Sequence, residues 1–338
     1  MKDTIAALFK QCGLGEITED IRPVSGGLMH KMYKVHATSG VYAVKCLNPE
    51  IMKRPGVLSN YEEAEKLERI LEAAEIPVIP ALSFNGDKML RAEGQYFYIF
   101  SWQEGSITDW NAITKEQCFR AGEILGQIHG IDAQNTEREE TEESAIVFGS
   151  YLQTAVEKNS SIAPLLKDSL PLLTKAQEKL NTARAALPAI LAIDDPDMDP
   201  KNIMWHENKA YVIDLECLER GNPAASCINL ALQWAGTVNG QYDRDNLRAF
   251  FTGYLQAYDN GFRSYEELYG IAYTWVEWLE YNIRRALGME GAEEDAIRLG
   301  EEEVRNTIGR IRYLDAIAED VCQVLREFPV SGMQDVSR

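Results

Sequence analysis

Two polar residues on either side of a predicted β-hairpin have types suited to handling phosphate. Asn202 directly precedes the apolar run 203–205, and Asp214 directly follows the run 210–213. These runs flank the polar segment 206–209, which is typical of a hairpin. Because an antiparallel hairpin brings its outer ends together, we expect Asn202 and Asp214 to lie side by side. A carboxylate and an amide oxygen placed there suit Mg²⁺ bound to phosphates.

A third polar residue, this one acidic, gives the arrangement a second chemical function. Asp197 lies five residues before Asn202, close enough for its carboxylate to receive a proton from a hydroxyl group. Taken alone, the Asp-x-x-x-x-Asn spacing is more often that of an ordinary polar loop.

The combined pattern resembles the catalytic and metal-binding loops of the kinase fold. More narrowly, it is similar to the aminoglycoside phosphotransferase and choline kinase superfamily, from Val24 to about Leu287. The catalytic segment of that family reads His-x-Asp-x-x-x-x-Asn, and its metal strand commonly reads Ile-Asp-aromatic/Leu-Glu. The resemblance implies that Asp197 is the catalytic base and that Asn202 and Asp214 are Mg²⁺ ligands. It leaves Glu216 as a neighbour of the metal site.

The N-terminal part contains a matching nucleotide lysine. Lys45 lies between apolar residues on the third predicted strand, where the family keeps a lysine for the α- and β-phosphates. A solvated strand lysine is the competing interpretation. The following helix should supply a carboxylate for this lysine, and we assign that role to Glu63, because the family keeps an apolar packing residue at the position of Leu67. Glu62 and Glu65 point elsewhere on the helical wheel, and we expect them to be solvated.

Two further segments complete the implied nucleotide site, which takes ATP or GTP. One resembles the loop that covers the phosphates, although two glycines alone are more often a plain turn. The other resembles the hinge between the lobes, whose backbone would meet the purine edge. The residues concerned are Ser25, Gly26 and Gly27 in the loop, and Phe100, Ser101 and Trp102 in the hinge.

Three positions depart from the family pattern. The first catalytic-loop position is Asp195 instead of His, a loop position that is often Asn is His30, and the Asp near the start of a later helix is Asn229. The first and last of these positions are mainly scaffolding for the catalytic loop in the family. Their change favours, as an alternative, a slow enzyme or a nucleotide-binding pseudokinase that serves as a scaffold.

The acceptor is indicated by an aromatic stripe. Trp275, Trp278 and Tyr281 recur at three-residue intervals with Glu277 and Glu280 nearby. Aromatic faces with carboxylates suit an amine or quaternary ammonium, so we expect a cationic alcohol of the aminoglycoside or amino-alcohol type. Core packing between helices explains the stripe as well. A macrolide, a sugar, a spore-associated metabolite and a protein side chain remain alternatives. Two catalytic-loop residues are further candidate contacts: Asp199 for the acceptor and Lys201 for the γ-phosphate.

The elements that position these residues form an α+β, bilobal, protein-kinase-like fold. Residues 1–103 are predicted to form a small antiparallel β N-lobe with one inserted helix, and a hinge lies near 100–104. Residues 104–338 are predicted to form a large helical C-lobe carrying the catalytic loop, the metal site and the acceptor pocket. Helices are predicted at 4–13, 61–74, 116–129, 151–156, 164–186, 247–257, 265–287 and 292–328.

Composition excludes several classes of protein. The net charge of −19 argues against nucleic acid as a partner. The first 100 residues hold 12 basic and 13 acidic side chains, so the excess of acid lies in the remainder. No apolar run is long enough to span a bilayer, and the N-terminus lacks a signal-peptide pattern. The six cysteines are far apart, which is typical of reduced thiols, so we expect a cytoplasmic protein.

Overall fold

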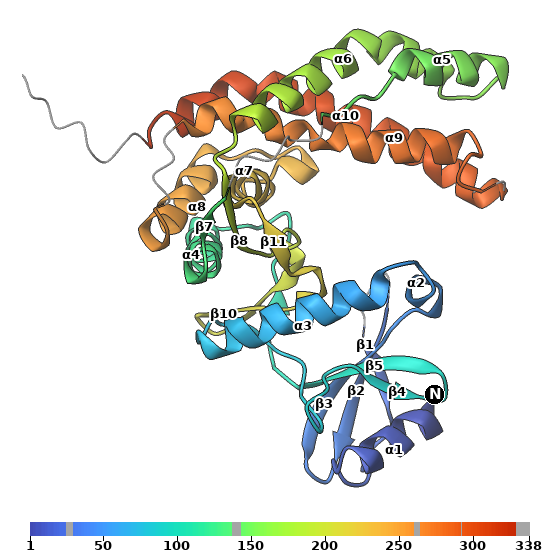
Figure 1. Ribbon diagram of the computed structural model, residues 1–338, viewed down its shortest axis with the longest axis vertical. Coiled ribbons are helices and arrows are strands. Elements are labelled where there is room, and N and C mark those ends of the chain that lie inside the picture. The colour runs from blue at the N-terminus through green and yellow to red at the C-terminus, as the bar shows by residue number, and fades with distance from the viewer. Residues whose placement is uncertain (25–29, 137–142, 260–263, 292, 329–338) are drawn as a thin grey trace, which may run out of the picture. The chain divides into compact units, whose positions relative to one another are not determined.

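The computed structural model of the protein describes residues 1–24, 30–136, 143–259, 264–291 and 293–328. The chain divides into two compact units. One consists of Met1–Thr108 together with Asp195–Glu219, and the other of Asp109–Asp194 together with Arg220–Arg338. Figure 1 labels the elements of both units.

The first unit is built on a five-stranded antiparallel sheet in the order β1-β2-β3-β5-β4. The predicted strands of the N-terminal part are confirmed, with β2 pairing β3 and β3 pairing β5. Three helices accompany the sheet. The strands are β1 (Arg22–Val24), β2 (Lys31–Ala37), β3 (Gly40–Cys46), β4 (Leu90–Ala92) and β5 (Gln95–Ser101), and the helices are α1 (Lys2–Gln11), α2 (Pro49–Met52) and α3 (Val57–Ala73).

The sheet packs a different helix on each face, because successive strand side chains point in opposite directions. In β5, Phe97 and Ile99 belong to a buried cluster that includes Phe9 of α1. Tyr98 between them belongs to a second cluster with Tyr61 of α3. Figure 1 shows α1 and α3 on opposite sides of these strands. Both faces of the sheet are therefore covered, and the α3 face is the one that carries the site.

The predicted hairpin is confirmed. Strands β9 (Ile203–His206) and β10 (Lys209–Val212) pair in antiparallel register, from Lys209 opposite His206 to Val212 opposite Ile203. The short strand β6 (Ser106–Ile107) extends this sheet by pairing with β9. A backbone hydrogen bond of 2.9 Å from Ile79 N to Val212 O joins the hairpin to the chain that follows α3.

These contacts explain why residues 195–219 belong to the first unit. We had assigned them to a C-lobe that begins at residue 104, whereas the compact unit runs to Thr108 and then includes the hairpin and both of its flanking loops. The pairing of β6 with β9 and the link from Ile79 bind the hairpin to the N-terminal segment.

The second unit is mainly helical, as predicted, with one small sheet in the order β11-β8-β7. The predicted helix 265–287 is divided into a 3₁₀ segment, η4, followed by α9, and α7 is an additional helix. The helices are α4 (Lys115–Ile131), α5 (Phe148–Glu157), α6 (Ala163–Ala186), α7 (Pro223–Trp234), η3 (Thr237–Asn239), α8 (Arg244–Ala257), η4 (Tyr265–Thr274), α9 (Trp275–Ala286) and α10 (Glu294–Leu325), and the strands are β7 (Gln134–Asn135), β8 (Ile190–Asp194) and β11 (Glu219–Gly221).

Two glycines let the backbones of α4 and α8 approach closely. A Cβ atom on Gly122 would lie 2.1 Å from the carbonyl oxygen of Phe250, and one on Gly253 would lie 2.1 Å from that of Phe119. Any larger residue would therefore force the two helices apart. Among the described helices of the whole chain, none combines the length and apolar character needed to cross a membrane.

Candidate active site

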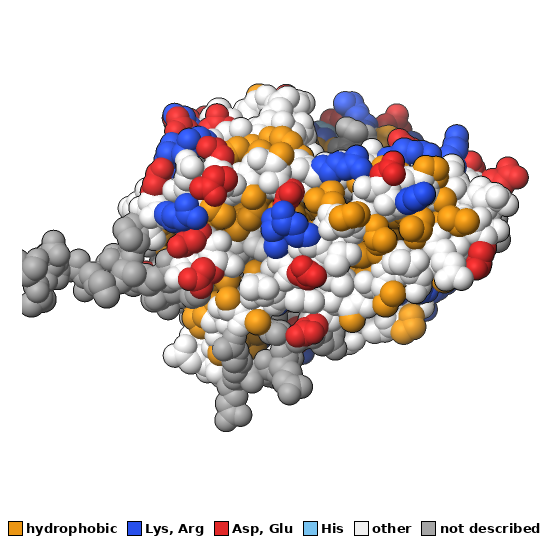
Figure 2. Space-filling view, turned by 90° about the horizontal axis from the view of Figure 1, so that it is seen from above, with side chains coloured by type: hydrophobic (Ala, Val, Ile, Leu, Met, Phe, Trp, Pro, Cys, Tyr) orange, Lys and Arg blue, Asp and Glu red, His pale blue; other side chains and the backbone are white. Residues whose placement is uncertain are grey.

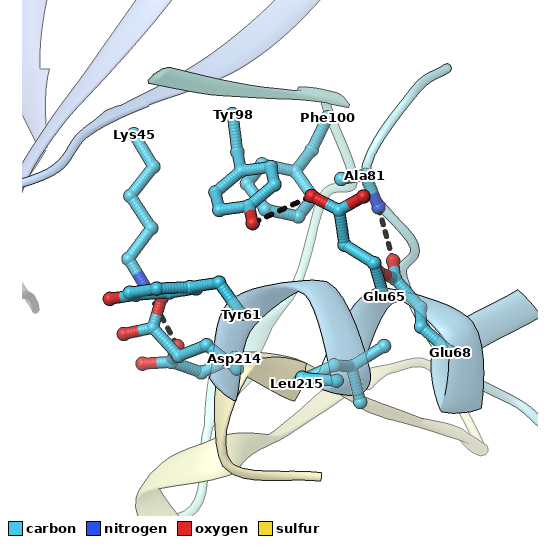
Figure 3. A pocket seen from close by; sticks show the side chains of 11 residues that line it. Lys45, Tyr61, Glu65, Glu68, Ala81, Tyr98, Phe100, Asp214 and Leu215 are labelled. Carbon is cyan, nitrogen blue, oxygen red and sulfur yellow. Dashed lines mark hydrogen bonds and ion pairs between the residues drawn. The ribbon is translucent and has the colours of Figure 1, made fainter. Parts of the chain in front are cut away.

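Lys45 lies at the centre of the candidate site. It sits on β3 opposite Tyr98 of β5, with its side chain buried on the α3 face. Its Nζ donates to Asp214 Oδ1 at 2.6 Å and to Glu216 Oε2 at 2.7 Å. Burial alone would lower the pKa of Lys45, but the two carboxylates outweigh it and raise that pKa. Lys45 is therefore a cation held between two anions (Figure 3).

Asp214 reaches this position through an unusual backbone conformation. It follows β10 and has φ 64° and ψ 54°, in the left-handed region, before the 3₁₀ turn η2 (Leu215–Cys217). This conformation costs about 1–2 kcal/mol for most residues, although Asp tolerates it better than others. Strain of this kind gathers at functional sites. The turn after the hairpin thus carries both Lys45 partners, Asp214 and Glu216.

Glu216 joins Lys45 to His30. Its Oε1 lies 3.0 Å from His30 Nε2, while its Oε2 contacts Lys45. His30 Nδ1 accepts a hydrogen bond from the backbone N–H of Asn48 at 2.9 Å. Burial would raise the pKa of Glu216, but the hydrogen bond from His30 and the charge of Lys45 keep it below its usual value. The family position that is often Asn is thus a buried histidine that contacts Glu216.

The loop before the hairpin gathers polar groups around Asp197. Asn202, at the end of the 3₁₀ turn η1 (Pro200–Asn202), donates its side-chain N–H to Asp197 O and to Asp197 Oδ2, both at 2.8 Å. Lys201 Nζ donates to Asp197 Oδ1 at 2.9 Å and to Asp199 Oδ2 at 2.6 Å. Both oxygens of the Asp197 carboxylate are therefore held in place by residues of the same loop.

The predicted proximity of the hairpin ends is confirmed for the backbone. Ile213 N, next to Asp214, donates to Asn202 O at 2.9 Å. The antiparallel pairing of β9 and β10 thus continues by one further pair, Asn202 with Ile213. Asn202 and Asp214 therefore lie at the same open end of the hairpin.

The donor set at this end of the hairpin fits Mg²⁺ that is carried by a phosphorylated ligand. Within the described residues, no group of three or more His, Cys, Asp or Glu side chains could hold a metal by itself. Asn202 and Asp214 instead provide one amide and one carboxylate oxygen, and the Asn202 side-chain nitrogen is turned toward Asp197. Mg²⁺ usually takes one or two protein ligands and completes its shell with phosphate oxygens and water.

The expected pairing of Glu63 with Lys45 is wrong. Glu63 is exposed and pairs with Lys66 on its own helix at 2.9 Å. The reason is the phase of α3, whose buried residues include Tyr61, Ala64 and Leu67. At about 100° per residue, Glu63 lies at the edge of the buried face of α3 that is farther from Lys45.

Glu65, which we had expected to be solvated, lines the site instead. It belongs to the stripe of α3 that begins with Tyr61, four residues earlier, and its Oε1 accepts hydrogen bonds from Tyr98 Oη at 2.9 Å and from Met89 N at 3.1 Å. Figure 3 shows its carboxylate joined to the Tyr98 hydroxyl at the wall of a pocket. The i, i+4 spacing from Tyr61 is the signal that could have identified it. The pocket is lined by Lys45, Tyr61, Ala64, Glu65, Glu68, Ala81, Tyr98, Phe100, Asp214, Leu215 and Glu216.

Of the two predicted nucleotide segments, only the hinge falls within the described residues. Ser25, Gly26 and Gly27 lie outside the described residues. Phe100 lines the pocket, whereas Ser101, the last residue of β5, is exposed. Trp102 donates its indole N–H to Glu104 at 2.7 Å and lies under Lys34. Of the hinge residues, Phe100 is thus the one whose side chain reaches the pocket.

The three aromatic residues predicted to contact the acceptor lie in the second unit and do not form one group, whereas Asp199, the further candidate, lies in the first unit. Trp278 and Tyr281 of α9 stack at 5.5 Å and are 43% and 42% exposed. Trp275 is covered by the guanidinium of Arg310, 3.9 Å from the ring centroid. Figure 2, seen from the side of α5, α6, α9 and α10, shows apolar side chains among charged ones on this face of the second unit. Trp278 and Tyr281 are therefore surface residues and not part of a helix core.

Of the two scaffolding departures, Asp195 has a local role in the structure, and nothing in the structure explains Asn229. Asp195 is buried, and its Oδ1 accepts the N–H of Asp197 at 3.2 Å, so it helps to hold the loop before the hairpin in place. Asn229 is half-buried in the middle of α7. Within the second unit, Asp194 at the end of β8 receives hydrogen bonds from two residues, lying 3.0 Å from His129 Nε2 and 2.6 Å from Ser226 Oγ. No spacing or motif in the sequence indicates this buried cluster.

Comparisons with known proteins agree with this geometry. A model of the phosphotransferase enzyme family matches residues 20–269. A spectinomycin phosphotransferase in complex with ADP and spectinomycin has 11% identity and a TM-score of 0.66 over 93% of this chain and 98% of its own. No curated protein matches the chain by sequence.

Two other solved structures are similar at comparable identity. An amicoumacin kinase in complex with AMP-PNP, Ca²⁺ and Ami has 10% identity and a TM-score of 0.57 over 91% of this chain and 93% of its own. Choline kinase from Cryptosporidium parvum has 12% identity and a TM-score of 0.56 over 97% and 99%. At such identities the likeness concerns the fold, and it confirms the predicted kinase-like class.

Proposed function

The chain belongs to the phosphotransferase enzyme family, and from this premise we propose that it transfers the γ-phosphate of ATP or GTP to a hydroxyl group of a small, cationic molecule. The observation that carries the proposal is the contact of the buried Lys45 with Asp214, across 169 residues of sequence, in the same unit as the hydrogen-bonded pair of Asn202 and Asp197. A lysine for phosphates, two metal-ligand candidates and a candidate base thus gather in one compact unit.

The nucleotide would be held by groups of the first unit. Lys45 would hold the α- and β-phosphates, while Asn202 and Asp214 would hold Mg²⁺, which when bound neutralises charge on the β- and γ-phosphates. We assign the loop of Ser25, Gly26 and Gly27 to the phosphates. The segment of Phe100, Ser101 and Trp102 would meet the base, and the reach of Phe100 into the pocket supports that part of the assignment.

Asp197 would orient the acceptor hydroxyl and take its proton late in the transfer. Phosphoryl transfer needs positioning and charge neutralisation more than covalent help. The two hydrogen bonds from Lys201 and Asn202 to the Asp197 carboxylate support this role, because they fix both of its oxygens. Lys201 also places a positive charge beside the base, where the γ-phosphate would arrive.

The acceptor is proposed to be an amino-alcohol or an aminoglycoside. Support comes from the net charge of −19, and from the exposed, stacked pair of Trp278 and Tyr281. Stacked aromatic faces near carboxylates attract organic cations. Asp199 is a further proposed contact. Because such transfer uses a cytoplasmic cosubstrate and the six cysteines are free thiols, we also propose a cytoplasmic location.

A second candidate is a nucleotide-binding pseudokinase, and the departures at Asp195 and Asn229 favour it. Both proposals include nucleotide binding, but only the first includes turnover. A direct test is transfer of radiolabelled γ-phosphate from Mg-ATP or Mg-GTP to a panel of acceptors, with thermal shift by the same nucleotides measured in parallel.

We expect label in aminoglycosides or amino-alcohols, and none in matched neutral sugars or macrolides. Label found instead in a sugar, a macrolide or a protein would replace the acceptor class. Nucleotide-dependent stabilisation without label in any acceptor, and without hydrolysis, would favour the pseudokinase. If the nucleotides do not stabilise the protein and no acceptor is labelled, both candidates are rejected.

A further inference from the structure

We propose that Glu216, held by His30, is the carboxylate that positions Lys45 for the nucleotide, a role that the sequence assigned to helix α3. The inference rests on the proposed function and deepens it. It concerns positioning residues, because neither Glu216 nor His30 is assigned a contact with the transferred phosphate.

The acidic side chains of α3 that line the same pocket as Lys45 form hydrogen bonds with other partners. Glu65 accepts from Tyr98 Oη and Met89 N. Glu68 accepts the backbone N–H of Ala81 at 2.6 Å and pairs with the buried Lys88 at 3.1 Å. These bonds connect α3 to other segments of the first unit and not to Lys45.

Glu216 has the geometry that the role requires. Its carboxylate uses one oxygen for Lys45, at 2.7 Å, and the other for His30, at 3.0 Å. The Glu216 side chain is 18% exposed, and the other two are more deeply buried. A carboxylate held at both oxygens cannot rotate freely, so Glu216 holds the Lys45 ammonium in one position.

The position of His30 is in turn fixed by the backbone. Its Nδ1 accepts the N–H of Asn48 at 2.9 Å, so in the neutral ring Nε2 carries the hydrogen and donates to Glu216. Asn48 also caps α2 by accepting from Glu50 N. His30 therefore connects Glu216 to a fixed point of the first unit.

The proposed metal site makes this partner necessary. Lys45 contacts Asp214 and Glu216 together. If Asp214 turns to Mg²⁺ as proposed, Lys45 keeps a carboxylate partner only through Glu216. The sequence departure at His30 then has a function, because an imidazole reaches Glu216 while it also accepts from Asn48.

The first test uses the metal-free protein and needs no activity. Unfolding by urea is measured for E216Q, H30L and the double variant, and for K45M, E216Q and their double variant. We expect both pairs to be non-additive by about threefold or more in the folding equilibrium constant. Additive losses in both pairs would mean that the three side chains are not coupled, and would overturn the inference.

The second test measures phosphoryl transfer with a kcat against KM split. We expect E216Q to lower kcat by about 10²-fold, as misplacement of a catalytic group does, and H30L to lower it in the wild-type background but not in E216Q. H30Q, whose amide can donate like Nε2, should recover part of the loss. E62Q, an exposed glutamate of α3, is the matched control and should behave like wild type.

The outcomes separate this inference from the proposed function. Loss of kcat in E63Q or E65Q, with E216Q unaffected, would return the role to α3 and overturn the inference while the enzyme assignment stands. Absence of transfer and hydrolysis in the wild type would reject the proposed function, and the metal-free coupling would still decide whether His30 and Glu216 hold Lys45.

Discussion

At the scale of single residues, the site depends on a few charged groups whose partners come from distant parts of the sequence. Lys45 and Glu216 are 171 residues apart and lie 2.7 Å from each other. Asp197 is held within its own loop by Lys201 and Asn202. In the proposed function the first group binds the phosphates and the second orients the hydroxyl, so substitutions in the two should have different kinetic effects.

Substitution of Asp197 by Ala should lower kcat by about 10²–10⁴-fold, the usual effect of removing a general base. Nucleotide affinity should change little, because Asp197 is assigned to the acceptor. Steady-state kinetics with calorimetric nucleotide binding would check this. Wild-type turnover in the variant on a confirmed substrate would show that Asp197 is not the base.

Substitution of Lys201 by Met should lower kcat for phosphoryl transfer, because it removes the ammonium that contacts Asp197 Oδ1 at 2.9 Å. Lys201→Arg keeps the charge and should retain more activity. Lys209, an exposed lysine at the start of β10, provides the matched Lys→Met control. Equal rates for K201M and K209M would indicate that Lys201 is only a solvated loop residue.

At the scale of elements, close packing and ion pairs between helices set the stability. The contact between α4 and α8 depends on Gly122, where a Cβ would meet the Phe250 carbonyl at 2.1 Å. Gly122→Ala should lower the free energy of unfolding by about 1–3 kcal/mol, as overpacking does. Gly149→Ala in α5 is the control, because nothing lies within 4 Å of its Cβ, and it should stabilise by about 0.5–1 kcal/mol. Urea unfolding would measure both, and equal effects would contradict this packing.

Asp315 links three elements of the second unit. It accepts from Lys179 of α6 at 2.6 Å and from Tyr273 of η4 at 3.2 Å. The hydrogen bond from Lys179 holds the pKa of Asp315 below its usual value. Its stabilising effect is therefore complete above the unfolded pKa of about 3.9 and is lost as the pH falls through the folded value.

Asp315→Asn should therefore destabilise the protein at pH 7 by less than about 1 kcal/mol, since the pair is partly exposed. The difference from wild type should shrink below about pH 4. Urea titrations at pH 7 and pH 3 would check this, and a difference that grows in acid would contradict the assigned sign.

The sequence predicted the parts of the site that depend on local pattern. The hairpin follows from the two apolar runs around 206–209, and its geometry places Asn202 beside Asp214 without further information. Lys45 follows from strand alternation and its apolar neighbours. Glu63 was wrong because its choice depended on an apolar residue four positions later, which does not determine which edge of α3 faces β3.

Other features could not be read from sequence, because they require long-range proximity. The pairing of Glu216 with His30 joins the turn after β10 to the chain before β2, through contacts that no periodicity reports. The assignment of residues 195–219 to the first unit depends on β6 pairing with β9 and on the hydrogen bond from Ile79. The 3₁₀ segment η4 keeps the periodic apolar pattern of a helix, so it appeared continuous with α9.

At the scale of the whole molecule, the excess of acidic residues bears on the acceptor. A negatively charged protein raises the local concentration of a cation, and salt screens this effect over about 10 Å at 0.1 M. The KM for a cationic acceptor should therefore rise between about 0.01 M and 0.15 M salt, while the KM of a neutral acceptor should not. A salt-independent KM for a confirmed cationic substrate would contradict the steering role of the acidic surface.

The central claim is that the two ends of the hairpin build a magnesium and phosphate site opposite Lys45. Calorimetry of ATP binding with and without Mg²⁺ tests it most directly, in the wild type, in D214A and in D87A, which removes an exposed carboxylate from a turn of the same unit. We expect Mg²⁺ to strengthen ATP binding in the wild type and in D87A, and this gain to disappear in D214A. An undiminished gain in D214A would contradict the claim.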